Sequence, residues 1–438
     1  MAADAPGCLR LASPFLHGRI LNKGHESSPK DVKSITGPKV IFRVLTRHYP
    51  LLPNRLMVGT KICPFEEWNE TPRHNTLLYA HKVPTEFMGA HGFSITRHYL
   101  CLETAWRVAW SNVFPPSKTS VRTIGFNSEM DALPEIGHAC GHNLIAMGGV
   151  AAALGTKHAM EKCGIEGRVV LLGTPAEDAG SGKIILIERG AYKEMDACLM
   201  MHPTPGPKLS AGTGSSLAIQ PIEVEYFGHP ARASGAPWEG QNSLDAAFLA
   251  YSSISALRQQ MKPTHRVHGI VEGREWAPNI IPDYAKIRWL VRAPTAKEVE
   301  VFQVAAALAT AYQIKLVEHP RVYDLRQNDE LASEFAAVIK QYGGIVFANV
   351  SGAAGGSTDF GNVTYELPTL HPSFAIPTAE NGRNHTRQFT DSAATKEAHA
   401  IEISVAKCIA LTGLRVLIDG DFYARLREAF EGDDSGSL

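Results

Sequence analysis

The sequence has no long apolar run, no excess of charge of either sign and no regular cysteine spacing. None of its apolar stretches approaches the roughly 18 consecutive apolar residues that a bilayer-spanning helix needs. Its 43 basic residues nearly balance its 44 acidic ones. Surfaces that bind nucleic acids or membranes carry blocks of like charge, which this chain lacks. We therefore expect a small-molecule ligand, with no nucleic-acid and no membrane partner.

The seven cysteines are an odd number and lie scattered along the chain. Disulfide-stapled domains are usually short and secreted, with cysteines at framework spacings. The pattern therefore favours a reducing compartment, and we expect a cytoplasmic protein. Residues 1–60 have few acidic and several basic side chains, so a mitochondrial transit segment is the alternative.

The order of the apolar segments indicates more than one domain. At 438 residues the chain is longer than one hydrophobic core usually holds. Residues 1–60 lack a sustained period and are interrupted by Pro, Gly and Lys, which predicts a poorly structured segment. Between about 121 and 202, strand and helix patterns alternate as βαβαβ. This predicts an α/β fold with a mainly parallel sheet, which binds ligands beyond the carboxyl ends of its strands.

Residues 215–322 follow the different order βαββαβ. This is the ferredoxin-like plan, and it predicts a domain inserted into the first one. The catalytic domain is then expected to comprise 61–214 and 323–425. The polar C-terminal residues 426–438 predict a disordered tail.

Four polar segments follow predicted strands or turns, namely EMDALPEIGHACGHN, TPAEDAGSG, MMHPTPG and NGRNHT. In the first, Cys140 and His142 are two residues apart in a loop before a helix, so a thiolate and an imidazole can approach one ion. Considered alone, such a cysteine is more often a small core residue, and such a histidine a polar residue at a helix start. The pair becomes informative only with the other segments.

Glu177 and Asp178 follow the strand VVLLGTP. A buried carboxylate pair is costly unless a cation or a proton lies between the two groups, although acidic residues also favour helix N-termini. His202 follows the apolar strand CLMM, where a lone histidine is usually structural, and His385 in a polar loop is by itself simply solvated.

The predicted sheet favours a metal site over these separate interpretations, because it brings the candidate ligands to one edge. Cys140, His142, Asp178 and His202 supply the N, S and O ligands that zinc prefers. A divalent ion there would lower the pKa of a bound water. Glu177 could accept the proton and later pass it to a leaving amine.

The motifs HACGHN, TPAED, MMHP and NHT together resemble those of the M-20 metallopeptidase family, in its branch of aminoacylases, amidohydrolases and beta-alanyl-lysine-type dipeptidases. The resemblance runs from about residue 88 to 415. It implies a metal-dependent amidohydrolase that cleaves the amide bond of an N-acyl amino acid or dipeptide-like substrate, with a metal-activated water and Glu177 as general base. It implies one or two divalent ions, zinc or alternatively manganese, held by Cys140, His142, Asp178, His202 and His385.

The resemblance also implies that residues 215–322 form a lid and dimerisation domain, and hence that the protein is a homodimer. Asn279 and the turn from Ser357 to Asp359 are then expected to line or support the substrate cleft. From the sequence alone, Asn279 could equally be a turn former.

Three features depart from the family pattern. Asp178 replaces a glutamate, so the ligand carboxylate is one methylene shorter, although Asp remains a competent oxygen ligand. Arg232 takes the place of a lid histidine that reaches across the dimer to the oxyanion, and it can donate hydrogen bonds but is longer and permanently charged. The first helix of the family is not recognisable between residues 60 and 87.

These departures leave two further interpretations open. The chain could be a catalytically weak relative that acts as a binding or scaffold protein. It could also be a hydrolase of a specialised-metabolite amide, with Arg232 defining the substrate. Turnover of N-acyl amino acids and dipeptides distinguishes these alternatives from the leading hypothesis.

Overall fold

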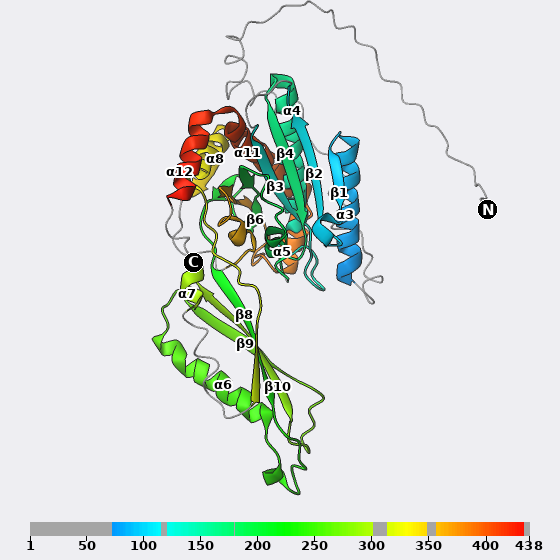
Figure 1. Ribbon diagram of the computed structural model, residues 1–438, viewed down its shortest axis with the longest axis vertical. Helices are drawn as coiled ribbons and strands as arrows, with labels where there is room; N and C mark the ends of the chain where they lie inside the picture. The colour runs from blue at the N-terminus through cyan, green and yellow to red at the C-terminus, as the bar shows by residue number, and fades with distance from the viewer. Residues whose placement is uncertain (1–71, 115–120, 179, 301–312, 348–355, 433–438) are drawn as a thin grey trace, which may run out of the picture.

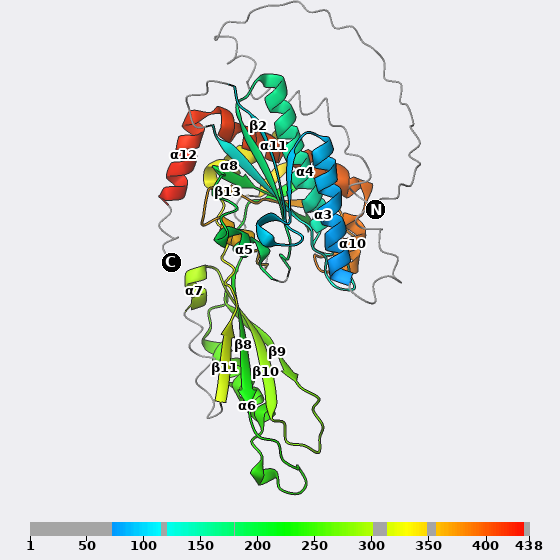
Figure 2. The same ribbon diagram turned by 45° about the vertical axis from the view of Figure 1, so that its right-hand side comes forward.

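The computed structural model describes residues 72–114, 121–178, 180–300, 313–347 and 356–432. The predicted poorly structured segment 1–60 lies outside these residues. Figures 1 and 2 show a layered α/β body from which a narrow sheet with one long helix projects, so that the molecule is elongated. Among the described residues, no helix combines the length and the apolar character needed to cross a membrane.

The main sheet of the α/β body has six strands. Strands β4, β3, β5 and β13 pair in parallel, whereas β1 and β2 are antiparallel additions at one edge. The mixed α/β fold with a mainly parallel sheet is therefore confirmed. In spatial order the strands are β1 (Ser94–Arg97), β2 (Trp106–Asn112), β4 (Gly167–Thr174), β3 (Thr123–Glu129), β5 (Ala197–Leu199) and β13 (Thr369–Leu370).

Helices cover both faces of this sheet, and strand β4 shows how. Val169 and Leu171 pack into the core formed with helices α4 and α11, whereas Val170 and Leu172 pack into the core on the opposite face, with α5 and α9. Burial on both faces explains the continuous apolar run VVLL. The helices are α4 (His142–Cys163), α11 (Lys396–Ile418), α5 (Gly182–Glu188) and α9 (Phe360–Val363).

A second, four-stranded sheet lies in the same body, in the order β12-β7-β14-β6. The chain passes from the first sheet to the second within a short segment: β5 ends at Leu199, inside the predicted apolar strand CLMM, and β6 begins at His202. The strands of the second sheet are β12 (Ile345–Phe347), β7 (Ser210–Gly212), β14 (Ser373–Ile376) and β6 (His202–Pro205).

Two helices correct expectations from the sequence. Helix α3 (Pro72–Ala90) occupies the segment in which no first helix was recognisable, because Pro84 in its interior hides the pattern. Helix α12 (Gly420–Glu431) extends past residue 426, so the predicted disordered tail is wrong for residues 426–431. The Asp419 side chain caps α12 by accepting a hydrogen bond from the Phe422 N–H at 2.9 Å.

The remaining short elements complete the body. Helix α8 (Asp329–Gln341) packs against both α11 and α12, and α10 (Arg387–Ala393) precedes α11. Single 3-10 turns lie at Tyr99–Cys101 in the body and at Pro237–Glu239 and Arg258–Gln260 in the projecting part.

The projecting part, residues 218–318, is called the insert below. Its elements follow the order βαββαβ, and its antiparallel sheet has the order β11-β8-β10-β9. Ile287 and Trp289 of the sheet pack with Ala247 of helix α6. The elements are β8 (Ala218–Phe227), α6 (Ser243–Leu257), β9 (Arg266–Gly273), β10 (Tyr284–Ala293), α7 (Ala296–Glu300) and β11 (Gln313–Glu318).

Candidate metal centre

The loop that carries Cys140 and His142 is shaped by a glycine. Gly141 has φ 84°, in the left-handed region, and it immediately precedes α4. A Cβ added there would lie 2.4 Å from Pro203 Cγ, so only glycine fits. This close approach brings the Cys140 loop against the start of β6, next to His202.

The other candidate ligands arrive from separate elements. Glu177 and Asp178 follow the carboxyl end of β4, after Ala176 with φ 63°. His385 also has a positive φ, 68°, and its backbone N–H donates to the Ala139 carbonyl oxygen at 2.8 Å. That bond ties the NHT loop to the Cys140 loop, although the two are far apart in the sequence.

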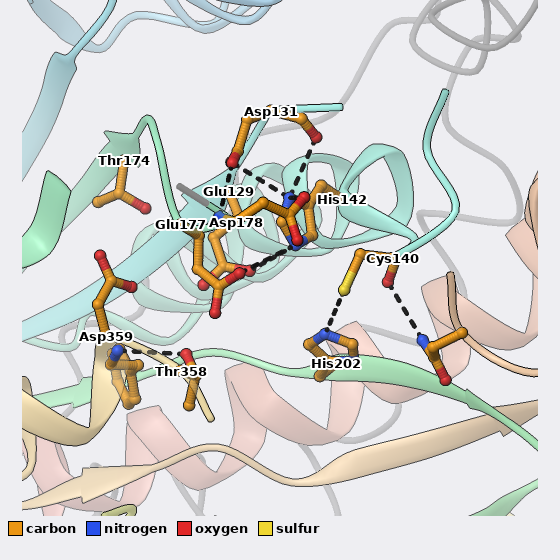
Figure 3. A network of polar contacts seen from close by, with 12 residues as sticks. Glu129, Asp131, Cys140, His142, Thr174, Glu177, Asp178, His202, Thr358 and Asp359 are labelled. Carbon is orange, nitrogen blue, oxygen red and sulfur yellow. Dashed lines mark hydrogen bonds and ion pairs between the residues drawn. The ribbon is translucent and has the colours of Figure 1, made fainter. Parts of the chain in front are cut away.

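The five predicted metal ligands meet at one place. Figure 3 shows four of them, Cys140, His142, Asp178 and His202. Cys140 Sγ lies 3.4 Å from His202 Nε2. Asp178 Oδ2 lies 3.9 Å from His142 Nδ1, and Asp178 Oδ1 lies 3.9 Å from His385 Nε2. In the two groups Cys140, His142, His202 and Cys140, Asp178, His385, the candidate ligand atoms all lie within 4.8 Å of one another.

The predicted general base belongs to the same cluster. Glu177 Oε2 lies 3.7 Å from His142 Nε2. Burial, and then the negative charge of Glu129, raise the pKa of Glu177 well above its ordinary value. A carboxylate with a raised pKa is better suited to accept and return a proton near neutral pH than an ordinary one.

Two further carboxylates were not assigned from the sequence. Asp131 and Glu129 lie on either side of the His142 ring: Asp131 Oδ1 is 3.2 Å from Nδ1, and Glu129 Oε2 is 3.4 Å from Nε2. Both belong to EMD, within a segment already singled out as polar: Glu129 is the last residue of β3, and Asp131 follows the strand by two residues. Their position at the end of a parallel strand indicated that they lie near the site. It could not show whether they bind the ion themselves or support the residues that do.

The side chains present fit a divalent cation. His142 Nε2, Asp178 Oδ2 and Glu129 Oε2 are buried and have no hydrogen-bond partner among the described residues. Buried polar atoms in this state are costly unless an ion or water satisfies them. Sulfur, nitrogen and oxygen donors converge there, a set that suits a transition metal such as zinc.

The protonation states respond to burial. In the absence of a bound ion, burial raises the pKa of the Cys140 thiol to about 11 and lowers the pKa of His202 to about 4. The imidazole is therefore neutral at pH 7 and able to ligate, whereas the thiol must lose its proton as an ion binds. Metal uptake is thus expected to release a proton.

The residues expected at the substrate cleft are placed differently from one another. Ser357 Oγ accepts from Arg292 Nη1 of the insert at 2.8 Å. Asp359 is 2% exposed and accepts hydrogen bonds from Lys183, so its carboxylate is already engaged within the protein. Asn279 and Arg232 lie together at the far end of the insert, where Ala233 N–H donates to the Asn279 carbonyl oxygen at 3.1 Å.

Arg232 is exposed and is not brought to the cluster by its own chain. The loop between β8 and α6 that carries it lies at the end of the insert opposite the α/β body (Figure 1). Its predicted catalytic role therefore requires a second chain.

A cavity of about 750 Å³ lies where the insert joins the body, and sequence reasoning did not find it. Arg266, His268 and Arg292 line it together with Ser215 and Ser216. None of the described acidic residues forms an ion pair with Arg292. The cavity therefore offers positive charge and hydroxyl groups to an anionic ligand.

Comparisons with known proteins agree with this geometry. Residues 125–405 match the model of "Peptidase family M20/M25/M40". The chain is 39% identical to the Xaa-Arg dipeptidase of Mus musculus over 368 residues, which cover 78% of this chain and 84% of that protein. It is 40% identical to the Xaa-Arg dipeptidase of Homo sapiens over 377 residues, covering 81% and 84%.

A solved structure supports the fold. A dinuclear metal-binding peptidase of the M20 family from Bacillus subtilis superimposes with a TM-score of 0.59 at 17% identity, covering 83% of this chain and 98% of that one. At this identity the likeness concerns the fold alone.

Proposed function

We propose that this chain is a dipeptidase with Xaa-Arg dipeptides among its substrates. The chain belongs to peptidase family M20/M25/M40 and is a metal-dependent amidohydrolase. The observation that carries this proposal is the convergence of five ligand-type side chains with Glu177 beside them. The choice of dipeptide is supported by the 39% and 40% identity to two Xaa-Arg dipeptidases.

Within this proposal the metal is held by Cys140, His142, Asp178, His202 and His385. A bound divalent ion would supply a water of lowered pKa and polarise the scissile carbonyl. We propose zinc in preference to manganese, because a thiolate ligand is soft and suits zinc better. One or two ions are compatible with the donor groups that share Cys140 and His142.

Side chains of the protein carry out the proton transfer, orient the ligand His142 and bind the substrate. Glu177 accepts a proton from the attacking water and returns it to the leaving nitrogen. Asp131 fixes the orientation of the His142 ring through Nδ1. The cavity with Arg292, Arg266 and His268 receives the free carboxylate of the substrate, because guanidinium groups pair with carboxylates in two-pronged geometry.

We further propose a homodimer in which the insert is both lid and dimer interface. Strand β9 is an edge of the insert sheet, and an open edge invites pairing with another chain. Apolar side chains are exposed nearby: Ile270 on β9 is 52% exposed, and Phe248 and Leu249 on α6 are 53% and 56% exposed. A dimer would also offer Arg232 a route to a catalytic centre.

The test is turnover by the purified full chain loaded with zinc or manganese. Ala-Arg, Ala-Lys, Ala-Glu, Ala-argininamide and N-acetyl-arginine would be compared, with release of the free amine followed by mass spectrometry. We expect Ala-Arg to be cleaved, and Ala-argininamide to be cleaved at least tenfold less efficiently because it lacks the carboxylate. Metal-loaded protein that cleaves none of them would refute the dipeptidase and favour the binding or scaffold alternative.

A further inference from the structure

Lys183 is a buried cation beside the candidate centre. Among the described residues it is the one such cation that has no role in the mechanism proposed above. It is the second residue of α5, and its side chain is 0% exposed. Its ammonium nitrogen donates to Glu129 Oε1 at 2.7 Å and to Asp359 Oδ1 at 2.5 Å. Its backbone N–H donates to Asp359 Oδ2 at 2.9 Å, so Asp359 binds both the side chain and the main chain of Lys183.

A fully buried ammonium group is costly unless opposite charges and hydrogen bonds compensate it. The side chains of both carboxylate partners are also 0% exposed. Burial opposes the charge of Lys183, but Asp359 and Glu129 raise the pKa of Lys183 well above its ordinary value. Lys183 is therefore charged over the whole range in which the protein is expected to act.

The link from Lys183 to the centre passes through Glu129. One oxygen of Glu129 is taken by Lys183, and the other, Oε2, lies 3.4 Å from His142 Nε2 without a hydrogen-bond partner among the described residues. That His142 nitrogen also faces Glu177 at 3.7 Å. The Lys183 bond thus determines which way Glu129 points at the edge of the centre.

We propose that Lys183 is a positioning residue of the metal centre: through Glu129 it fixes the negative charge that faces His142 Nε2, where the ion would bind. This rests on the proposed metal site and adds a residue to it. Lys183 reaches neither the candidate ligands nor the substrate cavity directly, so its effect is expected on metal affinity and kcat and not on KM.

A second role could explain the same contacts. Lys183 also joins α5 to the turn that carries Asp359, and this turn leads back to Ser357 and its bond with Arg292. If Lys183 served only to hold that turn, the Asp359 bond would matter and the Glu129 bond would not. Substituting the two carboxylates separately distinguishes the roles.

The experiment compares the parent with Lys183→Met, Glu129→Gln and Asp359→Asn. Gln at 129 keeps an oxygen that can accept from Lys183 but removes the negative charge facing His142. Asn at 359 cannot accept both bonds from Lys183, because one of its two atoms is a donor. Lys286→Met is the matched control, since Lys286 also lies between two carboxylates, Glu223 at 3.2 Å and Glu272 at 3.4 Å, but in the insert sheet.

The readouts are the dissociation constant for Co²⁺, the visible absorption spectrum of the cobalt form, and kcat and KM for a cleaved dipeptide. We expect Lys183→Met and Glu129→Gln each to weaken cobalt binding and lower kcat by about 10- to 100-fold, the usual effect of a residue that orients a ligand. Both should change the spectrum while KM stays within about threefold. Asp359→Asn should lower the melting temperature and leave the cobalt affinity near that of the parent, as should Lys286→Met.

Parental cobalt affinity and spectrum in Glu129→Gln would overturn the proposal, even if Lys183→Met failed to fold. An equal or larger change in Asp359→Asn would overturn it as well, in favour of the turn-holding role. Cobalt binding by the parent tests the proposed metal site separately: a parent that binds no cobalt contradicts that site, whereas only differences among the variants bear on Lys183.

Discussion

Asp131 holds the ring of His142 by a single nitrogen. Its Oδ1 lies 3.2 Å from His142 Nδ1, and its backbone carbonyl oxygen lies 3.1 Å from the same atom. Both groups are acceptors, so they keep a proton on Nδ1, and Nε2 is the nitrogen that gives up its proton when an ion binds. In the absence of an ion, burial opposes the charge of His142, but Cys140 and Asp131 raise the pKa of His142 well above its ordinary value. Burial opposes ionisation of Asp131, but the charge of His142 and the hydrogen bond with it hold the pKa of Asp131 below its ordinary value. In the proposed metal site, the pair therefore presents His142 to the ion through Nε2.

We predict that Asp131→Asn weakens metal binding and activity by about 10- to 100-fold, since a side-chain amide can turn its donor towards Nδ1 and lose the preference for this tautomer. Isothermal titration with zinc or cobalt would measure the affinity. Asp324→Asn is a suitable control, because Asp324 is also buried and accepts from Ala296 N–H at 2.8 Å, outside the cluster. An affinity for Asp131→Asn equal to that of this control would contradict the assigned tautomer.

Glu177→Gln is expected to retain its metal and to lose activity by about 100- to 10,000-fold, the usual range for removal of a general base. The amide has nearly the same shape but cannot accept the proton of the attacking water. Metal content by mass spectrometry and kcat on a cleaved dipeptide are the measurements. Glu194→Gln, which alters only an exposed ion pair with Arg107, serves as the control. A Gln variant with near-parental kcat would leave Glu177 without a role in proton transfer.

The convergence of the candidate ligands could be predicted because it depends on chain topology. Cys140 and Asp178 follow neighbouring parallel strands, β3 and β4, whose carboxyl ends meet at one edge. The Lys183 network could not be predicted in this way. Whether a lysine near a helix start points to solvent or into a core depends on packing, and its bond to Asp359 joins residues 176 positions apart.

The missed helix α3 and the divided strand have local causes. Pro84 lies inside α3 and interrupts the helical pattern of the sequence. The helix nevertheless forms, and its contacts with β1 and β2 stabilise it. The run CLMM is apolar throughout, so it gives no sign that the chain changes sheets after Leu199. Hydrophobic period alone cannot locate such a change.

Arg232 provides a test of the proposed dimer, since it lies far from the centre of its own chain. If it acts in the partner's catalytic centre, Arg232→Ala and Glu177→Gln should each be nearly inactive, and a mixture should regain activity. In the mixed dimer, the subunit with alanine keeps a complete centre and receives Arg232 from the other subunit. Random exchange at equal amounts gives a complete centre in about a quarter of the sites, as two-fold symmetry requires.

The mixing experiment needs subunit exchange, which light scattering at increasing dilution would establish first. Ile270→Lys places a charge on the exposed edge strand β9 and should shift the protein towards monomers and abolish the regained activity. Regained activity that persists in monomers, or an Arg232→Ala variant as active as the parent, would contradict a role for Arg232 across the dimer.

Glu402 lies in α11 inside the core and gives a prediction about stability that is independent of the metal. Its side chain is 0% exposed, and neither carboxylate oxygen has a hydrogen-bond partner among the described residues. The nearest charged contact is His399 Nδ1, 3.6 Å from Oε2. Burial raises the pKa of Glu402 well above its ordinary value, so the folded protein keeps a proton that the unfolded chain releases.

The sign of the pH dependence follows from this difference in bound protons. Below the unfolded pKa both states are protonated and Glu402 costs no stability through ionisation. As pH rises above that value, the unfolded chain loses the proton first, and the free energy of unfolding falls by about 1.4 kcal/mol per pH unit until the folded pKa is reached. Glu402→Gln is neutral at every pH and should therefore gain stability over the parent as pH rises from 5 to 8.

Urea unfolding at both pH values would measure this gain in stability. Glu397→Gln, on the exposed side of the same helix, is the control that should show no gain. A parent and a Gln variant with the same change in unfolding free energy between pH 5 and 8 would mean that Glu402 is ionised in the fold, held by a partner such as His399.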